Sequence, residues 1–180
     1  MTFPKDKTCC FTGHRRVADS KLPEIVKKLR LEIEFLQSYG INNFVAGGAL
    51  GFDTLAALAV LLQKQKSDDI YLHLMLPCHN QCFRWKERDI AIYNNILERA
   101  DSKVYLSDHY HGGVMQLRNR AMVDASDYCI CYFDEDAVSS AKTGGGTLYT
   151  VNYARKKGLC IVNLWDEPPE DVQLTFDFTE

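Results

Sequence analysis

The sequence lacks any long apolar run, and this absence limits the classes of protein to which it can belong. None of its 180 residues belong to a segment apolar enough to span a bilayer, and the first residues, MTFPKDKTCC, lack the apolar core of a secretory signal. Its seven cysteines are an odd number and several lie in apolar runs, which is typical of reduced thiols. We therefore expect a cytoplasmic protein with no membrane partner.

A strong charge of either sign is also missing. The 21 Lys and Arg residues against 24 Asp and Glu give a formal net charge of −3, which argues against a dedicated nucleic-acid-binding protein. There is no internal repeat, low-complexity tract or linker. The composition is ordinary for a globular protein, so we expect one domain over residues 1–180.

Two familiar nucleotide-binding signatures are absent. No G-x-x-x-x-G-K-[ST] pattern occurs, which disfavours a P-loop NTPase. The first glycine turn, Thr12-Gly13-His14-Arg15-Arg16, does not carry G-x-G-x-x-G. The next apolar run ends in glycines instead of the acidic residue that binds a ribose, so a standard NAD dehydrogenase is disfavoured as well.

Short apolar runs alternate with longer amphipathic ones along the whole chain. Residues 8–12, 44–46, 71–76, 104–106, 128–133 and 160–164 are the expected strands. Residues 22–39, 55–62, 83–100, 114–125 and 146–157 are the expected helices. The alternation predicts a Rossmann-like three-layer α/β/α sandwich with a mostly parallel sheet of about six strands. The acidic tail, 166–180, is expected to form an edge strand or a partner contact.

Glycines gather after the predicted strands, and Gly40 and Gly158 alone end helices. Loops that follow parallel strands emerge at one edge of the sheet, where ligands bind. The stretch "GGALGFD", residues 47–53, enters a helix, and we expect its backbone amides to hold a phosphate or carboxylate there. Asp53 or Thr54 is also a candidate helix cap. The alternative is that the glycines only permit tight turns.

Several side chains near this edge have two interpretations. Trp85 is suited to stack on a base, but it also fits a helix core. Arg118 and Arg120 are candidate anion ligands or solvated surface residues. His14 is expected to orient a ligand by donating a hydrogen bond. Cys78, His79 and Cys82, together with Asp108, His109 and His111, match no standard zinc spacing, so we expect no metal.

Five segments in this order resemble the YpsA-like family of the SLOG superfamily, which includes DprA and the LOG-type phosphoribohydrolases. These segments are "CCFTGHRR", "GGALGFD", "LP" followed by "RWKERD", "QLRNRAMVD" and "GGGTLYTVNYARKKG". The resemblance implies a Rossmann-like sheet that binds a nucleotide or nucleotide derivative. With the residues argued above, the expected ligand-binding set is Thr12, Gly13, His14, Arg15, Arg16, Gly47, Gly48, Ala49, Gly51, Asp53, Pro77, Trp85, Arg118, Asn119, Arg120, Gly144, Gly145, Gly146 and Thr147.

The resemblance leaves the activity open between three functions. LOG enzymes carry G-G-x-G-T-x-x-E, and alignment on Gly146-Thr147 puts Thr150 in place of the glutamate, so no catalytic residue is assigned. The favoured function is binding of a nucleotide-derived small molecule, such as an ADP-ribose-like one, by a sensor or regulator that forms a homodimer. The alternatives are a hydrolase of an N-glycosidic or phosphate-linked nucleotide bond, and a DprA-like single-stranded DNA binder.

Overall fold

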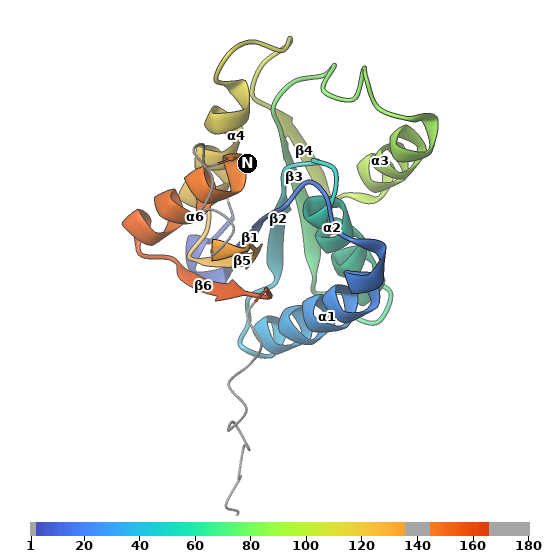
Figure 1. Ribbon diagram of the computed structural model, residues 1–180. Helices are drawn as coiled ribbons and strands as arrows, with labels where there is room; N and C mark the ends of the chain where they lie inside the picture. Colours follow the sequence, from blue (N-terminus) through green and yellow to red (C-terminus); the bar gives the residue numbers. More distant parts are fainter. Residues whose placement is uncertain (1–2, 136–144, 166–180) are drawn as a thin grey trace, which may run out of the picture.

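The structure is a computed structural model that describes residues 3–135 and 145–165 (Figure 1). Its six strands form one sheet in the order β4-β3-β2-β1-β5-β6, and every neighbouring pair is parallel. The strands are β1 (Thr8–Gly13), β2 (Asn43–Ala46), β3 (Tyr71–Leu76), β4 (Ser102–Tyr105), β5 (Tyr128–Tyr132) and β6 (Cys160–Asn163). The predicted Rossmann-like α/β class is confirmed.

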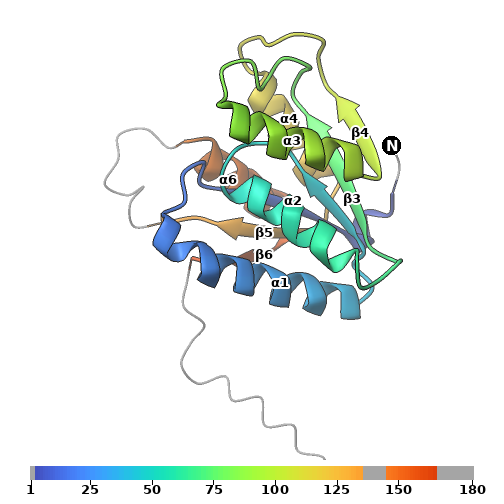
Figure 2. The same ribbon diagram turned by 90° about the vertical axis from the view of Figure 1, so that its right-hand side faces the viewer.

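Helices cover both faces of the sheet. The helices are α1 (Leu22–Ser38), α2 (Phe52–Gln63), α3 (Glu87–Arg99), α4 (Val114–Asp124) and α6 (Gly146–Lys157), with the short 3-10 turns η1 (Lys5–Lys7) and η2 (Asp19–Lys21). Helices α1, α2 and α3 lie on one face, and α4 and α6 lie on the other (Figures 1 and 2). No helix in the described part of the chain is both long and apolar enough to cross a bilayer.

Two hydrophobic cores result from this double cover, because the central strands must bury both of their faces. One core places Phe11 and Phe44 against the α1 and α2 side, and the other places Cys10 and Cys129 against the α4 and α6 side. Cys10 and Cys129 face each other across the β1–β5 pair, and both are free, fully buried thiols. They pack there as small apolar side chains.

Three boundaries differ from the sequence prediction by two residues or more, and one of them is the start of α2, at Phe52 instead of residue 55. Helix α3 begins at Glu87 instead of residue 83, since Lys86 is extended and the acidic residues Glu87 and Asp89 favour a helix N-terminus. Strand β4 begins at Ser102, two residues early, because an edge strand tolerates the polar pair Ser102-Lys103. Residues 166–180, for which an edge strand or partner contact was expected, lie outside the described residues.

The topology fixes where a ligand can reach the sheet. The chain leaves β1 toward α1 on one face, whereas the segment that follows β5 leads to α6 on the opposite face. Adjacent strands with diverging connections leave a crevice outside their carboxyl ends. The edge of the sheet beyond β1 and β5 is therefore the place to look for a site.

Candidate functional site

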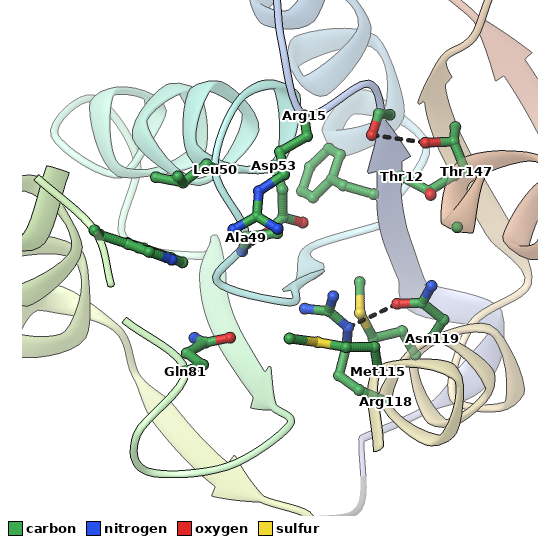
Figure 3. A pocket seen from close by; sticks show the side chains of 15 residues that line it. Thr12, Arg15, Ala49, Leu50, Asp53, Gln81, Met115, Arg118, Asn119 and Thr147 are labelled. Atoms are coloured by element: carbon green, nitrogen blue, oxygen red, sulfur yellow. Dashed lines mark hydrogen bonds between the residues drawn. The ribbon is translucent and has the colours of Figure 1, made fainter. Parts of the chain in front are cut away.

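A cavity of about 240 Å³ opens at this edge of the sheet (Figure 3). The end of β1, the loop before α2, the β3–α3 loop, one face of α4 and the start of α6 all contribute to its wall. The lining residues are Phe11, Thr12, Gly13, Arg15, Ala49, Leu50, Asp53, Gln81, Trp85, Met115, Arg118, Asn119, Met122, Gly146 and Thr147.

The structure brings many of the predicted site residues together at this cavity. Those that line it are Thr12, Gly13, Arg15, Ala49, Asp53, Trp85, Arg118, Asn119, Gly146 and Thr147. Those outside its lining are His14, Arg16, Gly47, Gly48, Gly51, Pro77, Arg120 and Gly145. Gly144 lies outside the described residues. Ligand binding by any of these residues stays a prediction.

Sequence reasoning missed five lining residues, Phe11, Leu50, Gln81, Met115 and Met122. A signal for two of them was present, because Met115 and Met122 share one helical face with Arg118 and Asn119 at spacings of three and four residues. Leu50 precedes Gly51, and Phe11 lies two residues before Gly13, and both glycines were identified. Nothing in the sequence distinguishes Gln81 from the other polar residues of its loop.

Two amides of the Gly47–Asp53 loop, at which we expected a phosphate, are bonded within the protein. The N–H of Gly47 donates to Asp53 Oδ1 at 3.1 Å, and the N–H of Ala49 donates to Oδ2 at 2.7 Å. The anion that this loop binds is thus the protein's own carboxylate. Burial raises the pKa of Asp53, while the Arg118 charge and the loop amides oppose that shift.

The loop glycines make room for other parts of the protein. A Cβ on Gly47 would lie 1.9 Å from the Arg118 guanidinium. Gly51 has a φ of +83°, and a Cβ there would lie 2.4 Å from the carbonyl oxygen of Arg15. The alternative that glycines permit close packing at the turn therefore holds for these two positions.

Arg118 forms part of the cavity floor, so its interpretation as a solvated surface residue is wrong. The side chain is buried, with 7% exposed. Its guanidinium donates to the carbonyl oxygen of Gly47 and, through Nε, to Asn119 Oδ1 at 2.7 Å. These two bonds use two of its five N–H donors, and its guanidinium end points into the cavity (Figure 3). Arg120, in contrast, is exposed.

The positive charge of Arg118 has a second cation nearby. Burial lowers the pKa of Arg118, Asp53 counteracts the shift, and the charge of Arg15 adds to it. Arg15 and Arg118 line the same cavity, so their like charges repel each other there. An anion bound between them would relieve this repulsion.

The start of α6 brings the N-terminal end of a helix to the same wall. Gly145 is the N-cap, no side chain caps the helix, and no acidic residue lies in its first turn. The Thr147 hydroxyl donates to the carbonyl oxygen of Gly13 at 2.9 Å, which ties the helix start to the end of β1. The first amides of an α-helix have no intrahelical acceptor, so this end attracts an anion.

Thr150, at the position of the LOG glutamate, plays a structural part. It is buried, its hydroxyl donates to the Gly146 carbonyl oxygen at 2.7 Å, and it accepts from Asn119 Nδ2 at 2.8 Å. The residue does not line the cavity. It braces the α4–α6 contact behind the site.

His14 holds a loop together and does not line the cavity, which differs from the expected ligand contact. Its Nε2 accepts the N–H of Asp134 at 3.0 Å, and its ring packs on Phe133 and Trp165. Burial lowers the pKa of His14, and the nearby Asp134 charge counteracts this. The neutral imidazole is the form that accepts this bond.

The cysteine and histidine side chains that were considered as zinc ligands have other contacts in the structure. Within residues 3–135 and 145–165, no three His, Cys, Asp or Glu side chains come together in a metal-binding group. Cys78 is buried, and the His79 ring stacks on Tyr105 with 3.7 Å between ring centroids. These residues support the β3–α3 loop.

A wider groove of about 1140 Å³ adjoins the cavity and shares part of its wall. Four cationic side chains line it, Arg15, Arg16, Arg84 and Lys86. Two aromatic residues in the same lining are strongly exposed, Phe83 at 82% and Tyr110 at 61%. The groove therefore combines positive charge with accessible aromatic rings.

A parallel sheet with helices on both faces defines the Rossmann-like α/β class, and the cationic cavity lies at the carboxyl edge of this sheet. Within that class, residues 10–163 match the family YpsA, described as "YspA SLOG family". The chain belongs to the YpsA family of the SLOG superfamily. The family suggested by the sequence motifs is confirmed.

Relatives and a solved structure give the same placement. A UPF0398 protein of Halalkalibacterium halodurans is 32% identical over 118 residues, which cover 64% of this chain and 62% of that protein. A UPF0398 protein of Staphylococcus epidermidis is 24% identical over 76% of this chain and 77% of its own length.

One structural neighbour is DNA processing protein A from Helicobacter pylori, described for its single-stranded DNA binding mode. The TM-score is 0.55 at 20% identity, over 86% of this chain and 63% of that one. This likeness shows the shared fold. The chain spans less than two thirds of this neighbour and of the Halalkalibacterium relative.

The tight turn at Gly51 predicts a difference between two matched glycine substitutions. Gly40 has a φ of +79° with open space around it, so Gly40→Ala should cost about 1–2 kcal/mol from backbone strain alone. Gly51→Ala adds the clash with the Arg15 carbonyl and should lose at least about 1 kcal/mol more. Urea unfolding measures both, and equal losses would contradict the packing role of Gly51.

The Asp53 bonds predict that its amide analogue destabilises the fold. Asn offers one oxygen where the loop amides need two acceptors, so Asp53→Asn should cost about 1–3 kcal/mol. Asp68 is exposed, and Asp68→Asn should change stability by less than about 0.5 kcal/mol. Denaturant titrations compare the two variants, and an Asp53→Asn protein as stable as the wild type would refute the bridging role.

Proposed function

We propose that this protein binds a nucleotide-derived small molecule in the cavity at the carboxyl edge of the sheet. The observation that carries the proposal is the electrostatics of the wall. Two repelling arginines and an uncapped helix N-terminus share one cavity, and the one acidic side chain in its lining, Asp53, is bonded to loop amides. Such a wall attracts a phosphate.

The phosphate belongs at the α6 end of the cavity. The amides at the start of α6 lie there beside Thr147 and Asn119, whereas the amides of Gly47 and Ala49 are engaged by Asp53. Figure 3 shows Arg15 and Arg118 approaching from different elements, the β1 loop and α4. A phosphate between them would receive donors from the main chain and from a guanidinium.

The opposite end of the cavity suits a base. Leu50, Met115 and Trp85 line it, and Trp85 lies in a loop instead of the helix expected from the sequence. Its ring meets Tyr93 edge to face at 5.4 Å and is half-buried. A half-buried indole at this end offers aromatic surface on which a base stacks.

A sensor or regulator fits this wall better than a hydrolase. Cleavage of an N-glycosidic bond needs a carboxylate that can reach the sugar or position water. Asp53 is 7% exposed and both of its oxygens accept loop amides, and Thr150 is buried behind the site. We infer reversible binding without turnover.

The arginine that lines the cavity from the β1 loop provides the test. Titration calorimetry with AMP and ADP-ribose should show binding, and Arg15→Gln should weaken it about 10- to 100-fold, as expected for a lost charge-assisted bond. Arg30→Gln, on the outer face of α1, is the matched control and should bind normally. Wild-type protein that binds neither compound, or an Arg15→Gln variant with unchanged affinity, would refute the proposal. Chromatography of the mixtures should find no free base.

The groove beside the cavity supports a second candidate function, binding of single-stranded DNA. Sites that bind single-stranded DNA usually combine positive charge along the DNA backbone with exposed aromatic rings on which the bases stack. Arg84, Phe83 and Tyr110 provide both here, and the DprA neighbour is described as binding this polymer. The net charge of −3 disfavours binding of a polyanion, so we rank single-stranded DNA second to a small molecule.

Salt dependence and one variant separate the two functions. If the groove binds DNA, a fluorescent dT12 oligonucleotide should bind with an affinity that falls steeply between 50 and 200 mM salt. Arg84→Gln should then weaken the oligonucleotide severalfold and leave AMP unchanged, because Arg84 lines the groove and not the cavity. If neither salt nor the Arg84→Gln substitution changes the affinity for dT12, the groove is not the site that binds it.

A further inference from the structure

Gln81 projects from the β3–α3 loop into the cavity, and its amide is fixed by two protein partners. Its Nε2 donates to the carbonyl oxygen of Gly48 at 3.2 Å and to the Tyr93 hydroxyl oxygen at 2.8 Å. A primary amide has two N–H donors, and these bonds use both of them. A backbone carbonyl only accepts, so the bond to Gly48 defines which way the amide is turned.

The atom of Gln81 left for a ligand is therefore its carbonyl oxygen, Oε1. Figure 3 shows this oxygen on the side of the amide that faces Arg118 across the cavity. The side chain is half-buried and lines both the cavity and the adjoining groove. A ligand that reaches it meets a hydrogen-bond acceptor and no donor.

Tyr93 keeps this arrangement constant. Burial raises the pKa of Tyr93 to about 12, so its hydroxyl stays protonated and neutral at physiological pH. The same ring contacts Trp85 edge to face, which places Gln81 at the Trp85 end of the cavity. Thr147 and Asn119 lie across the cavity from Gln81, at the end assigned to the phosphate (Figure 3).

Nucleobases differ in what they offer to a lone acceptor. Adenine and cytosine carry an exocyclic amino group that donates, whereas hypoxanthine and uracil place a carbonyl oxygen at the same ring position. A carbonyl facing Gln81 Oε1 would leave two acceptors opposed, and a bare C–H would leave Oε1 without a donor.

We propose that Gln81 selects the base of the ligand by accepting a hydrogen bond from its exocyclic amino group. The inference rests on the proposed function, since it names the base of the ligand bound in that cavity. Gln81 is then the specificity-determining residue at the base end, and Tyr93 and the Gly48 carbonyl orient it.

Three monophosphates that differ at ring position 6, with IMP also carrying a hydrogen on N1, test this directly. AMP carries the amino group, purine riboside 5′-monophosphate lacks it, and IMP replaces it with oxygen. Titration calorimetry should give purine riboside monophosphate about 5- to 10-fold weaker binding than AMP, the value of one hydrogen bond, and IMP weaker binding still. Purine riboside monophosphate or IMP that binds as tightly as AMP would overturn the selection by Gln81.

A matched pair of variants assigns the preference to this side chain. Gln81→Leu should lower the AMP affinity to that of purine riboside monophosphate and leave the latter unchanged. Gln37→Leu makes the same change on α1, where the Gln37 amide bonds to Ser67 and Asp69, and should keep the full preference. A Gln81→Leu variant that still prefers AMP would refute the assignment.

The comparison remains decisive if Gln81→Leu does not fold, because the wild-type protein alone measures the preference among the three ligands. Failure of this inference is also distinct from failure of the proposed function. In the first case the three monophosphates bind equally, and in the second case none of them binds.

Discussion

A buried carboxylate bonded to the loop that precedes it determines the shape of this site. Asp53 accepts the amides of Gly47 and Ala49, which folds the β2–α2 loop back onto the first turn of α2. The Arg118 guanidinium then fits against Gly47, where only a glycine leaves space, and donates to its carbonyl oxygen. The loop, the start of α2 and the cavity floor thus depend on one another, and the hydrogen bonds of Asp53 and Arg118 offset part of the cost of burying an anion and a cation.

This internal use of the glycine loop decides where an external anion can bind. With the Gly47 and Ala49 amides engaged, we propose the start of α6 as the main-chain donor site for an anion, and Arg15 and Arg118 add positive charge to the same cavity. The opposite end carries Trp85, Leu50 and the fixed acceptor of Gln81. A nucleotide has the same polarity, with phosphate at one end and a flat, hydrogen-bonding base at the other.

The sequence predicted the layers of the fold and much of the cavity wall, because both follow from local patterns. Alternating apolar runs specify parallel strands, and loops after such strands must meet at one edge, which correctly brought Gly13, Arg15 and Thr147 together. Partner choice could not be predicted in this way. Whether the amides of Gly47 meet a phosphate or Asp53, and whether Arg118 faces water or the floor, depends on contacts between residues as many as 71 positions apart.

The central claim is that the phosphate of a nucleotide binds at the start of α6 between Arg15 and Arg118. A crystal structure of the protein with AMP tests it most directly. We expect phosphate oxygens at about 2.7–3.2 Å from the Gly146 or Thr147 amide, with the Asp53 bonds to Gly47 and Ala49 intact. A phosphate seated on the Gly47 and Ala49 amides, with Asp53 displaced, would contradict it, as would a nucleotide bound away from this edge of the sheet.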